Sequence, residues 1–424
     1  MEKIIYHVDV NSAFLSWEAS YRVNVLGEAL DLRTVPSAIG GSEKDRHGII
    51  LAKSTEAKRY GIQTGEPLVS ARKKCPHLII AAPNYPMYTT ASKALIRLLY
   101  EFSPDIHQYS IDEAFVDMTG TDKLFGSPVI CAHMIKDKIK KELGFTVNIG
   151  ISSNKLLAKM ASDFKKPDRV HTLFPFEIKE KMWHLPVSDL FFVGRASEHK
   201  LRNYGIRTIG ELAKADPAFI KSILKSHGLL IWEFANGIAD QMDKFTLNPT
   251  NKGYGNSMTI PFDITTKEDA KAVLLSLTET VAARIRSDHA FISVVSVSIV
   301  DFNFAFSSKQ SSLNAPTDIT RQIYETACTI FDTMWDYTPI RQLGVHTSKA
   351  TSAQMYQYSF LDNYSIDKEI GLDKAIDNIR TTWGEDAIIR GKSLSMQNSH
   401  ALSHMAGGLD KTRRSGITKG ITTP

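Results

Sequence analysis

The sequence predicts a multidomain α+β protein. At 424 residues the chain is too long for one ordinary compact domain. Short apolar runs of strand length alternate with amphipathic helical patterns over residues 1–171 and again over residues 251–349. A helical segment, 172–241, separates these two parts. In the first part, this order favours a ferredoxin-like sheet with helices on one face.

The first predicted strand, KIIYHVDV, ends at Asp9, and a helix is expected from about Ala13. GIILAKST predicts another strand, and TEAKRYGI predicts a short helix that Gly61 ends. The apolar spacing of residues 88–102 predicts a further helix. Two strands, HQYSIDEAFVDM and FTVNIGIS, are expected on either side of the lysine-rich helix CAHMIKDKIKKEL, and the amphipathic helix NKLLAKMASDF follows them.

From residue 172 to about residue 241 the pattern is helical. Within it, FFVGRASEHKLRNYGIRTIGELA resembles a helix-hairpin-helix, which presents backbone N–H groups at a helix N-terminus to a phosphate. Phe192 stands where that motif usually has its first glycine, so a plain helical hairpin is an equal alternative.

A polar stretch at 242–250 predicts a linker. Beyond it, the strands MTIPFDI, ISVVSVSIVDF and RQLGVHTS, the helix KEDAKAVLLSLTETVAARIR and a helix over 318–337 predict a second α+β unit at 251–349. The pattern is mixed in the tail, 350–424. Its last part, 401–424, has the Gly, Ser, Thr and basic composition that is typical of disorder.

Composition narrows the class of protein. The three cysteines form no CxxC pair, so neither a disulfide framework nor a zinc site is expected, and a cytoplasmic location is the simplest inference. We expect no signal peptide and no membrane span, because no apolar run is long enough.

The net charge of the chain is only +5. Residues 134–169 carry nine Lys and Arg against four Asp and Glu, an excess that fits binding to a polyanion.

An acid pair, Asp112 and Glu113, interrupts a strand pattern in YSIDEAFVDMTG. Burying neighbouring carboxylates is costly unless cations or hydrogen-bond donors compensate them. An exposed strand end is one interpretation, and a divalent metal site is the other. Asp9 ends a strand that we expect in the same sheet. Because successive strand residues point to opposite faces, the three carboxylates can converge only if one of the pair lies at a turn or bulge.

Three carboxylates without histidine or cysteine favour hard, oxygen-seeking cations such as Mg²⁺. Two such ions could stabilise both the attacking and the leaving oxygen of a phosphoryl transfer. The acid cluster therefore indicates chemistry on a phosphate ester, with nearby lysines as candidate partners for the other phosphate oxygens.

Four segments resemble the Y family of DNA polymerases, the translesion enzymes. They are HVDVNSAFLSWE, STEAKRYGI, YSIDEAFVDMTG and GISSNKLLAKMASDFKKPDRV, in the order and spacing found in that family. The resemblance covers roughly residues 1–350. HVDVN and the spacing around Glu56 and Lys58 look closer to the UmuC branch than to the DinB branch.

The resemblance implies a right-hand polymerase with a ferredoxin-like palm, small fingers, a helical thumb and an added α+β little finger. The implied domains are the palm at 1–12 and 82–171, the fingers at 13–81, the thumb at 172–241, the linker at 242–250, the little finger at 251–349 and the C-terminal tail at 350–424.

The resemblance also implies that Asp9, Asp112 and Glu113 are the catalytic carboxylates. Together with the backbone carbonyl of Val10, they would hold two Mg²⁺ ions. Phe14 matches the steric gate, a ring beneath the nucleotide sugar that leaves no room for a 2′-hydroxyl.

By the same resemblance, the nucleotide triphosphate would contact Thr55, Lys58 and Lys166. The family commonly has Tyr and Arg at the first two positions, so the bidentate fork of arginine is absent and weaker nucleotide affinity is expected. Ile49 and Leu51 would roof the templating base. They are larger than the residues often found there, which predicts less room for bulky lesions. An ordinary buried strand would look the same.

The thumb and the little finger are expected to grip the duplex through its phosphates. The candidate DNA contacts are Gly194 and Arg195 in the thumb, and Ser307, Ser308 and Lys309 in the little finger. A solvated hairpin turn is the alternative for the second group. QYSFLD resembles the sliding-clamp motif of such polymerases, with Gln357, Phe360 and Leu361 as its contacts and Tyr358 in place of the expected Leu.

The resemblance implies a template-directed, low-fidelity translesion DNA polymerase that adds deoxynucleotides to a primer 3′ end opposite damaged DNA. The implied partners are primer–template DNA, deoxynucleoside triphosphates, the sliding clamp and accessory SOS proteins, and the family implies an SOS response and mutator activity. A catalytically silent DNA-binding protein is the alternative, but such a relative would be expected to lose a metal carboxylate. A nucleotidyl cyclase would not explain the thumb-like hairpin or the second α+β unit.

Overall fold

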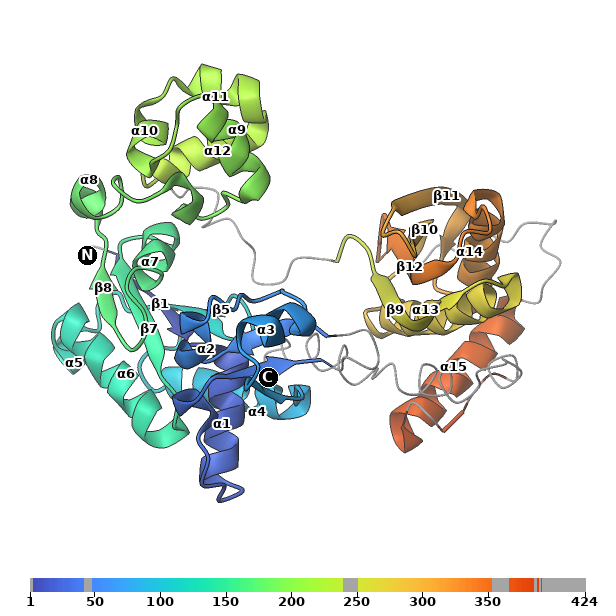
Figure 1. The fold of residues 1–424 in the computed structure, drawn as a ribbon, viewed down its shortest axis with the longest axis horizontal. Coiled ribbons are helices and arrows are strands. Elements are labelled where there is room, and N and C mark those ends of the chain that lie inside the picture. Colours follow the sequence, from blue (N-terminus) through green and yellow to red (C-terminus); the bar gives the residue numbers. More distant parts are fainter. Residues whose placement is uncertain are drawn as a thin grey trace. The chain divides into compact units, whose positions relative to one another are not determined.

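The structure is a computed structural model that describes residues 3–41, 48–238, 251–352, 366–384, 387, 388 and 390 (Figure 1). These residues form two compact units. The first comprises residues 3–41 and 49–238, and the second comprises residue 48 and the described residues from 251 onward.

The first unit is built on a five-stranded sheet in the order β5-β6-β1-β7-β8. Its strands are β1 (Ile5–Val10), β5 (Ile106–Gln108), β6 (Glu113–Asp117), β7 (Val147–Ser152) and β8 (Val170–Thr172). β1 lies at the centre and pairs antiparallel with β6 and β7. Every residue of β1 is buried, so this strand is covered on both faces.

Helices pack on both faces of this sheet, and the prediction of helices on one face is wrong. On one face, α4 (Tyr85–Leu99) and α6 (Pro128–Leu143) pack against Tyr6 and Val8. On the other face, α7 (Lys155–Ser162) lies against β7 and β1. A Cβ at Gly150 would lie 2.0 Å from a carbonyl oxygen of α7, so glycine permits this close approach.

The segment HQYSIDEAFVDM forms two antiparallel strands, β5 and β6, where one strand was predicted. The backbone N–H groups of Tyr109 and Ser110 both donate to the carbonyl of Glu113 and close the turn between them. The polar residues Ser110 and Asp112 favour this turn over a continuous strand. As a result, Asp112 lies in the turn and Glu113 begins β6.

The fingers contain a three-stranded sheet in the order β3-β2-β4. Its strands are β2 (Ser37–Gly40), β3 (Ile50–Lys53) and β4 (Ile79–Ala81), and its helices are α1 (Ala13–Asn24), α2 (Thr55–Arg59) and α3 (Leu68–Lys74). The predicted β3, α1 and α2 are confirmed. The short strands β2 and β4 were not predicted.

The segment after β8 is helical, as predicted. Its helices are α8 (Ile178–Lys181), α9 (Arg195–Asn203), α10 (Ile209–Lys214), α11 (Pro217–Leu224) and α12 (Ser226–Ala235). α9 and α10 form a hairpin around Gly205, which has a φ of +82°. Phe192 has a φ of +70°, which favours glycine, at the position where the helix-hairpin-helix motif usually has one.

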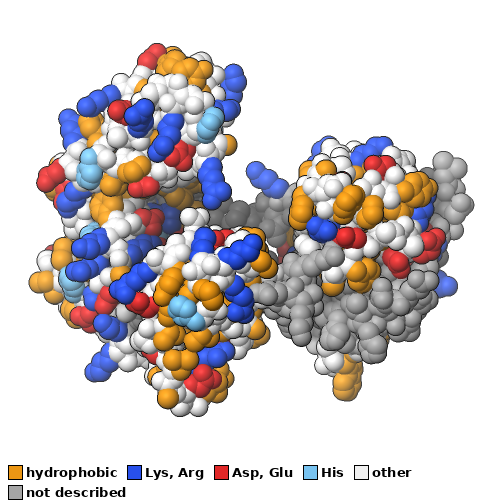
Figure 2. All heavy atoms as spheres, viewed as in Figure 1, with side chains coloured by type: hydrophobic (Ala, Val, Ile, Leu, Met, Phe, Trp, Pro, Cys, Tyr) orange, Lys and Arg blue, Asp and Glu red, His pale blue; other side chains and the backbone are white. Residues whose placement is uncertain are grey.

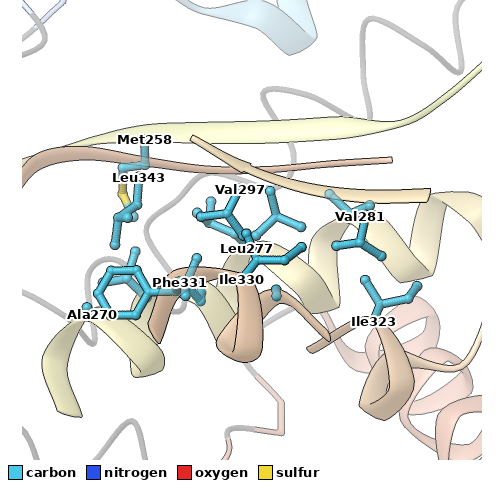
Figure 3. Packing of buried hydrophobic residues seen from close by; sticks show 14 of the residues in the cluster. Met258, Ala270, Leu277, Val281, Val297, Ile323, Ile330, Phe331 and Leu343 are labelled. Atoms are coloured by element: carbon cyan, nitrogen blue, oxygen red, sulfur yellow. The ribbon is translucent and has the colours of Figure 1, made fainter. Parts of the chain in front are cut away.

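The second unit is a four-stranded antiparallel sheet in the order β11-β10-β12-β9. Its elements are β9 (Gly255–Ile264), α13 (Lys267–Ser287), β10 (Ile292–Asp301), β11 (Phe306–Thr317), α14 (Thr320–Met334) and β12 (Ile340–Ser348). Figure 3 shows Leu277 of α13 and Phe331 of α14 packed beneath the sheet, in a core that also contains Leu343. SSKQSS is part of the edge strand β11, so the alternative of a solvated turn is wrong.

A further helix, α15 (Ile366–Trp383), lies in the segment that the sequence analysis described as mixed. Arg286 of α13 fixes it by donating to Asp373 at 3.1 Å and to Asp377. The Arg286 and Asp373 side chains are only 13% and 6% exposed. None of the helices within the described ranges is both long and apolar enough to cross a membrane.

Candidate active site

The three predicted catalytic carboxylates lie at one end of the central strands. Asp9 of β1 and Glu113 of β6 are direct partners in the antiparallel register. Asp112 precedes β6 in the turn, and its carbonyl accepts a hydrogen bond from the N–H of Val10 at 3.1 Å. The turn therefore supplies the break in strand alternation that convergence of these acids requires.

Asp9 is only 7% exposed, and one of its carboxylate oxygens lies 2.8 Å from the ammonium group of Lys166. Burial raises the pKa of Asp9, and the charge of Lys166 offsets only part of that effect. Lys166 also pairs with Asp163 at 2.8 Å. The triphosphate-binding lysine implied by the family resemblance therefore lies beside the first carboxylate.

Glu113 contacts two basic side chains that the sequence analysis did not identify. Its Oε2 atom lies 2.8 Å from Nζ of Lys159 and 3.3 Å from Nε2 of His7. Burial alone would raise the pKa of Glu113, but the contact with His7 and the charge of Lys159 outweigh it and lower the pKa to about 2. Glu113 is thus held as a carboxylate.

The donor atoms fit a hard divalent cation, because all three side chains offer carboxylate oxygens and Val10 offers a carbonyl. Their present arrangement is not a closed metal site: within the described ranges, no three His, Cys, Asp or Glu side chains gather closely enough to hold an ion. Lys166 and Lys159 bind one oxygen each of Asp9 and Glu113, and Ser110 donates to Asp112 at 2.6 Å.

A cavity of about 270 Å³ opens beside the acids. It brings together five of the predicted site residues, Val10, Phe14, Leu51, Lys58 and Asp112. The Phe14 ring stacks on Tyr88 of α4 with centroids 4.7 Å apart, which fixes the orientation of the ring. Ile49 is not among the lining residues. It precedes β3, is 46% exposed and forms a β-bridge with Pro67.

A second cavity, of about 330 Å³, contains the predicted triphosphate contacts Thr55, Lys58 and Lys166 together with Asp9. Lys58 lines both cavities. Arg33 and Asn11 also line the second cavity, and neither was predicted. Arg33 forms a bidentate pair with Asp31 and donates to the carbonyl of Gly144, so much of the Arg33 charge is already compensated within the protein.

One sequence signal could have revealed Lys159. It lies between Ala158 and Met160 in an otherwise apolar helical stretch, where a lone cation is out of place. Its ammonium group is 5.5 Å from the ring centroid of Tyr109 and 5.3 Å from that of Phe191. No local sequence pattern distinguishes His7, whose Nδ1 bonds to Ser162 at 2.7 Å.

The basic segment at 134–169 is largely neutralised within the protein. Five of its lysines form ion pairs with carboxylates, and these lysines are Lys136, Lys138, Lys140, Lys159 and Lys166. Figure 2 shows Lys and Arg side chains spread over the visible face of the first unit, with no single patch. The net charge of this segment therefore overstates the charge it presents to a polyanion.

The predicted DNA contacts lie on both units. Gly194 is the N-cap residue of α9 and has no side chain to cap the helix. Arg195 is the first residue of that helix and is exposed. Ser307, Ser308 and Lys309 are exposed on β11, where Lys309 donates to Thr333 at 3.1 Å. The predicted clamp contacts Gln357, Phe360 and Leu361 lie outside the described residues.

Known proteins resemble this chain in sequence and in fold. The impB/mucB/samB family matches residues 8–163, and the C-terminal domain of that family matches residues 251–360. DNA polymerase IV of Clostridium acetobutylicum is 46% identical over 397 residues, covering 94% of this chain and 100% of that protein. DNA polymerase IV of Acetivibrio thermocellus is 36% identical, covering 92% and 97% of the two chains.

A solved Y-family DNA polymerase chimera of Dbh and Dpo4 shares the fold, with a TM-score of 0.65 at 20% identity. The match covers 81% of this chain and 98% of that structure. The family match, these relatives and the shared fold define a DNA-directed DNA polymerase. The chain belongs to the impB/mucB/samB family, the Y family of DNA polymerases. These relatives do not support the prediction that the chain is more similar to the UmuC branch than to the DinB branch. That assignment stays a prediction.

Proposed function

We propose that the protein is a low-fidelity translesion DNA polymerase that extends a primer 3′ end by two-metal phosphoryl transfer. One observation carries the proposal: Asp9 and Glu113 face each other across β1 and β6, and Asp112 adjoins the cavity that Phe14 and Lys58 line. All three carboxylates expected of an active polymerase are present at one end of the central strands.

In this proposal Asp9, Asp112, Glu113 and the Val10 carbonyl hold two Mg²⁺ ions. Bound Mg²⁺ would polarise the primer hydroxyl and stabilise the charge that develops on the leaving pyrophosphate. Without the ions, Lys166 and Lys159 compensate the charges of Asp9 and Glu113.

The side chains around the cavities bind and orient the substrate. Phe14, which stacks on Tyr88, would lie beneath the sugar and exclude a 2′-hydroxyl, and Leu51 would cover the base pair. Thr55, Lys58 and Lys166 would contact the triphosphate. No covalent enzyme intermediate is needed, because positioning and charge stabilisation account for phosphoryl transfer.

The remaining expectations belong to the same proposal and rest on the family resemblance. They are low fidelity, a part in the SOS response, accessory proteins, a cytoplasmic location and docking on a sliding clamp through Gln357, Phe360 and Leu361. DNA would be held mainly by phosphate contacts from Gly194 and Arg195 in the thumb and from β11.

Primer extension tests the proposal. A labelled primer on undamaged and abasic templates is given Mg²⁺ and all four deoxynucleotides, with the wild type beside Asp112→Ala, Glu113→Ala and the double variant. Extension past the abasic site by the wild type alone is expected. A wild type that binds the template but never extends it, even with a sliding clamp and accessory proteins, would establish the silent DNA-binding alternative.

A further inference from the structure

Lys53 is a cation in the active-site cavity that neither the sequence analysis nor the family resemblance assigns. It ends β3, two residues after Leu51, so the two side chains lie on the same face of the strand. Both line the cavity that contains Phe14 and Asp112. Lys53 therefore shares one cavity with Leu51, the expected roof of the base pair, and with Lys58, an expected phosphate contact.

The position of the Lys53 ammonium group is fixed by a second element. Nζ donates to Oγ1 of Thr64 at 3.1 Å, and Thr64 also lines the cavity. The loop that carries Thr64 is tied to β3, because the N–H of Gly65 donates to the carbonyl of Ile50 at 2.8 Å. The hydrogen bond to Thr64 thus holds the Lys53 ammonium group at the wall of the cavity.

A second lysine, Lys58, lines the same cavity from α2. No hydrogen bond or ion pair of its ammonium group is found within the described part of the chain. Burial lowers the pKa of Lys53, and the nearby charge of Lys58 lowers it further. Like charges in one small cavity repel, and an anion bound between them would remove that cost.

The two acids near Lys53 and Lys58 have other partners in the protein. Asp112 is the one acid among its lining residues, and its carboxylate accepts from Ser110. Glu66, the other acid that acts on Lys53, is bound by Lys74. The two lysines are therefore arranged for a bound anion that comes from outside the protein.

We propose, resting on the proposed function, that Lys53 is a further nucleotide-binding residue that shares the incoming triphosphate with Lys58. Arginine presents two donors from one planar group, whereas here two point charges on β3 and α2 would divide that task. Such contacts carry no information about the base. Lys53 would thus strengthen nucleotide binding equally for all four deoxynucleotides.

The test compares Lys53→Met, which removes the charge at similar length, with Lys53→Arg and with Lys73→Met. Lys73 is an exposed lysine of α3 outside both cavities and serves as the matched control. Calorimetry measures binding of inorganic tripolyphosphate, which has no base or sugar. Steady-state extension gives KM and kcat for each deoxynucleotide, and thermal melting checks the fold of each variant.

We expect Lys53→Met to weaken tripolyphosphate binding and to raise KM for all four deoxynucleotides on the order of tenfold, with kcat nearly unchanged. Lys53→Arg should restore most of the affinity, and Lys73→Met should match the wild type. If Lys53→Met does not fold, Thr64→Val, which releases the Lys53 ammonium group, should give a smaller change in the same direction.

Three outcomes would overturn the assignment: unchanged tripolyphosphate affinity and KM, a change confined to one base pair, or weaker primer–template binding with unchanged nucleotide KM. These outcomes differ from failure of the polymerase proposal, in which the wild type itself extends no primer.

Discussion

At the scale of single residues, Lys58 is notable because it lines both cavities of the candidate active site. An arginine there would offer two parallel donors to a phosphate, whereas lysine offers one compact charge. The residue types at positions 55 and 58 therefore predict a site that binds nucleotides less tightly than one with tyrosine and arginine.

The Lys58→Arg variant should lower the nucleotide KM by about threefold to tenfold, because a bidentate charged contact replaces a single one. Steady-state primer extension on an undamaged template measures this. Lys73→Arg makes the same chemical change outside the cavities and should leave KM unaltered. No improvement in Lys58→Arg would show that the lysine does not limit nucleotide affinity.

The grouping of Asp9, Asp112 and Glu113 could be predicted because their spacing and strand pattern carry the information. Their partner Lys159 stands out as a cation in an apolar helical stretch, but its contact with Glu113 and the role of His7 could not be predicted, because those contacts depend on which face of β1 meets α7. Leu51 lines the cavity as expected, but Ile49 does not, since its backbone bridges to Pro67 before β3 begins.

At the scale of elements, the contact between α7 and β7 depends on Gly150. A Cβ there would meet backbone atoms at 2.0 Å and 2.4 Å, and backbone cannot yield as a flexible side chain can. This close packing places Lys159 of α7 over Glu113 of β6.

Gly150→Ala should therefore destabilise the protein by about 3 kcal/mol, as overpacking a tight contact does. Urea unfolding followed by circular dichroism measures the change. Gly371→Ala is the matched control, because that helical glycine has no atom within 4 Å of an added Cβ, and it should stabilise α15 by up to about 1 kcal/mol. Equal stability of Gly150→Ala and the wild type would contradict the packing described.

The helix α15 is held by charges more than by an apolar face. Breaking a buried ion pair from one side leaves an uncompensated charge, so Arg286→Met should destabilise the docking of α15 by about 3 kcal/mol. Hydrogen exchange of residues 366–383 measures this directly. Arg321→Met removes an exposed pair with Glu369 and should have little effect. Unchanged exchange in Arg286→Met would show that α15 docks by other contacts.

Long periodic helices and buried strands were predictable, because their patterns repeat over many residues. The strands β2 and β4 have four and three residues, too few to establish a period. α15 was missed because only three of its residues are buried, so its apolar stripe is narrow.

At the scale of the whole molecule, charge that is paired internally differs from charge that is presented to DNA. Lys138 binds Glu101 and Glu142 at 3.1 Å and 3.0 Å, whereas Arg195 is exposed at the start of α9. The sequence shows net charge along the chain, but only the fold shows which charges are already compensated.

Arg195→Ala should reduce the slope of log Kd for primer–template against log salt by about 0.9, the effect of losing one phosphate contact. Lys138→Ala should leave the slope unchanged, because its charge is already compensated. Fluorescence anisotropy across a salt series measures both. A reduced slope in Lys138→Ala alone would place the DNA contact on the palm.

Alternate residues of the short strand β1 lie in two different environments. Tyr6 and Val8 belong to the core beneath α4 and α6, while His7 contacts Glu113 and Asp9 contacts Lys166. In a saturation mutagenesis screen that scores cellular abundance and lesion bypass separately, neighbouring codons should therefore fail for different reasons. Substitutions at the first pair should lower abundance, and substitutions at Asp9 should leave an abundant protein that cannot bypass damage.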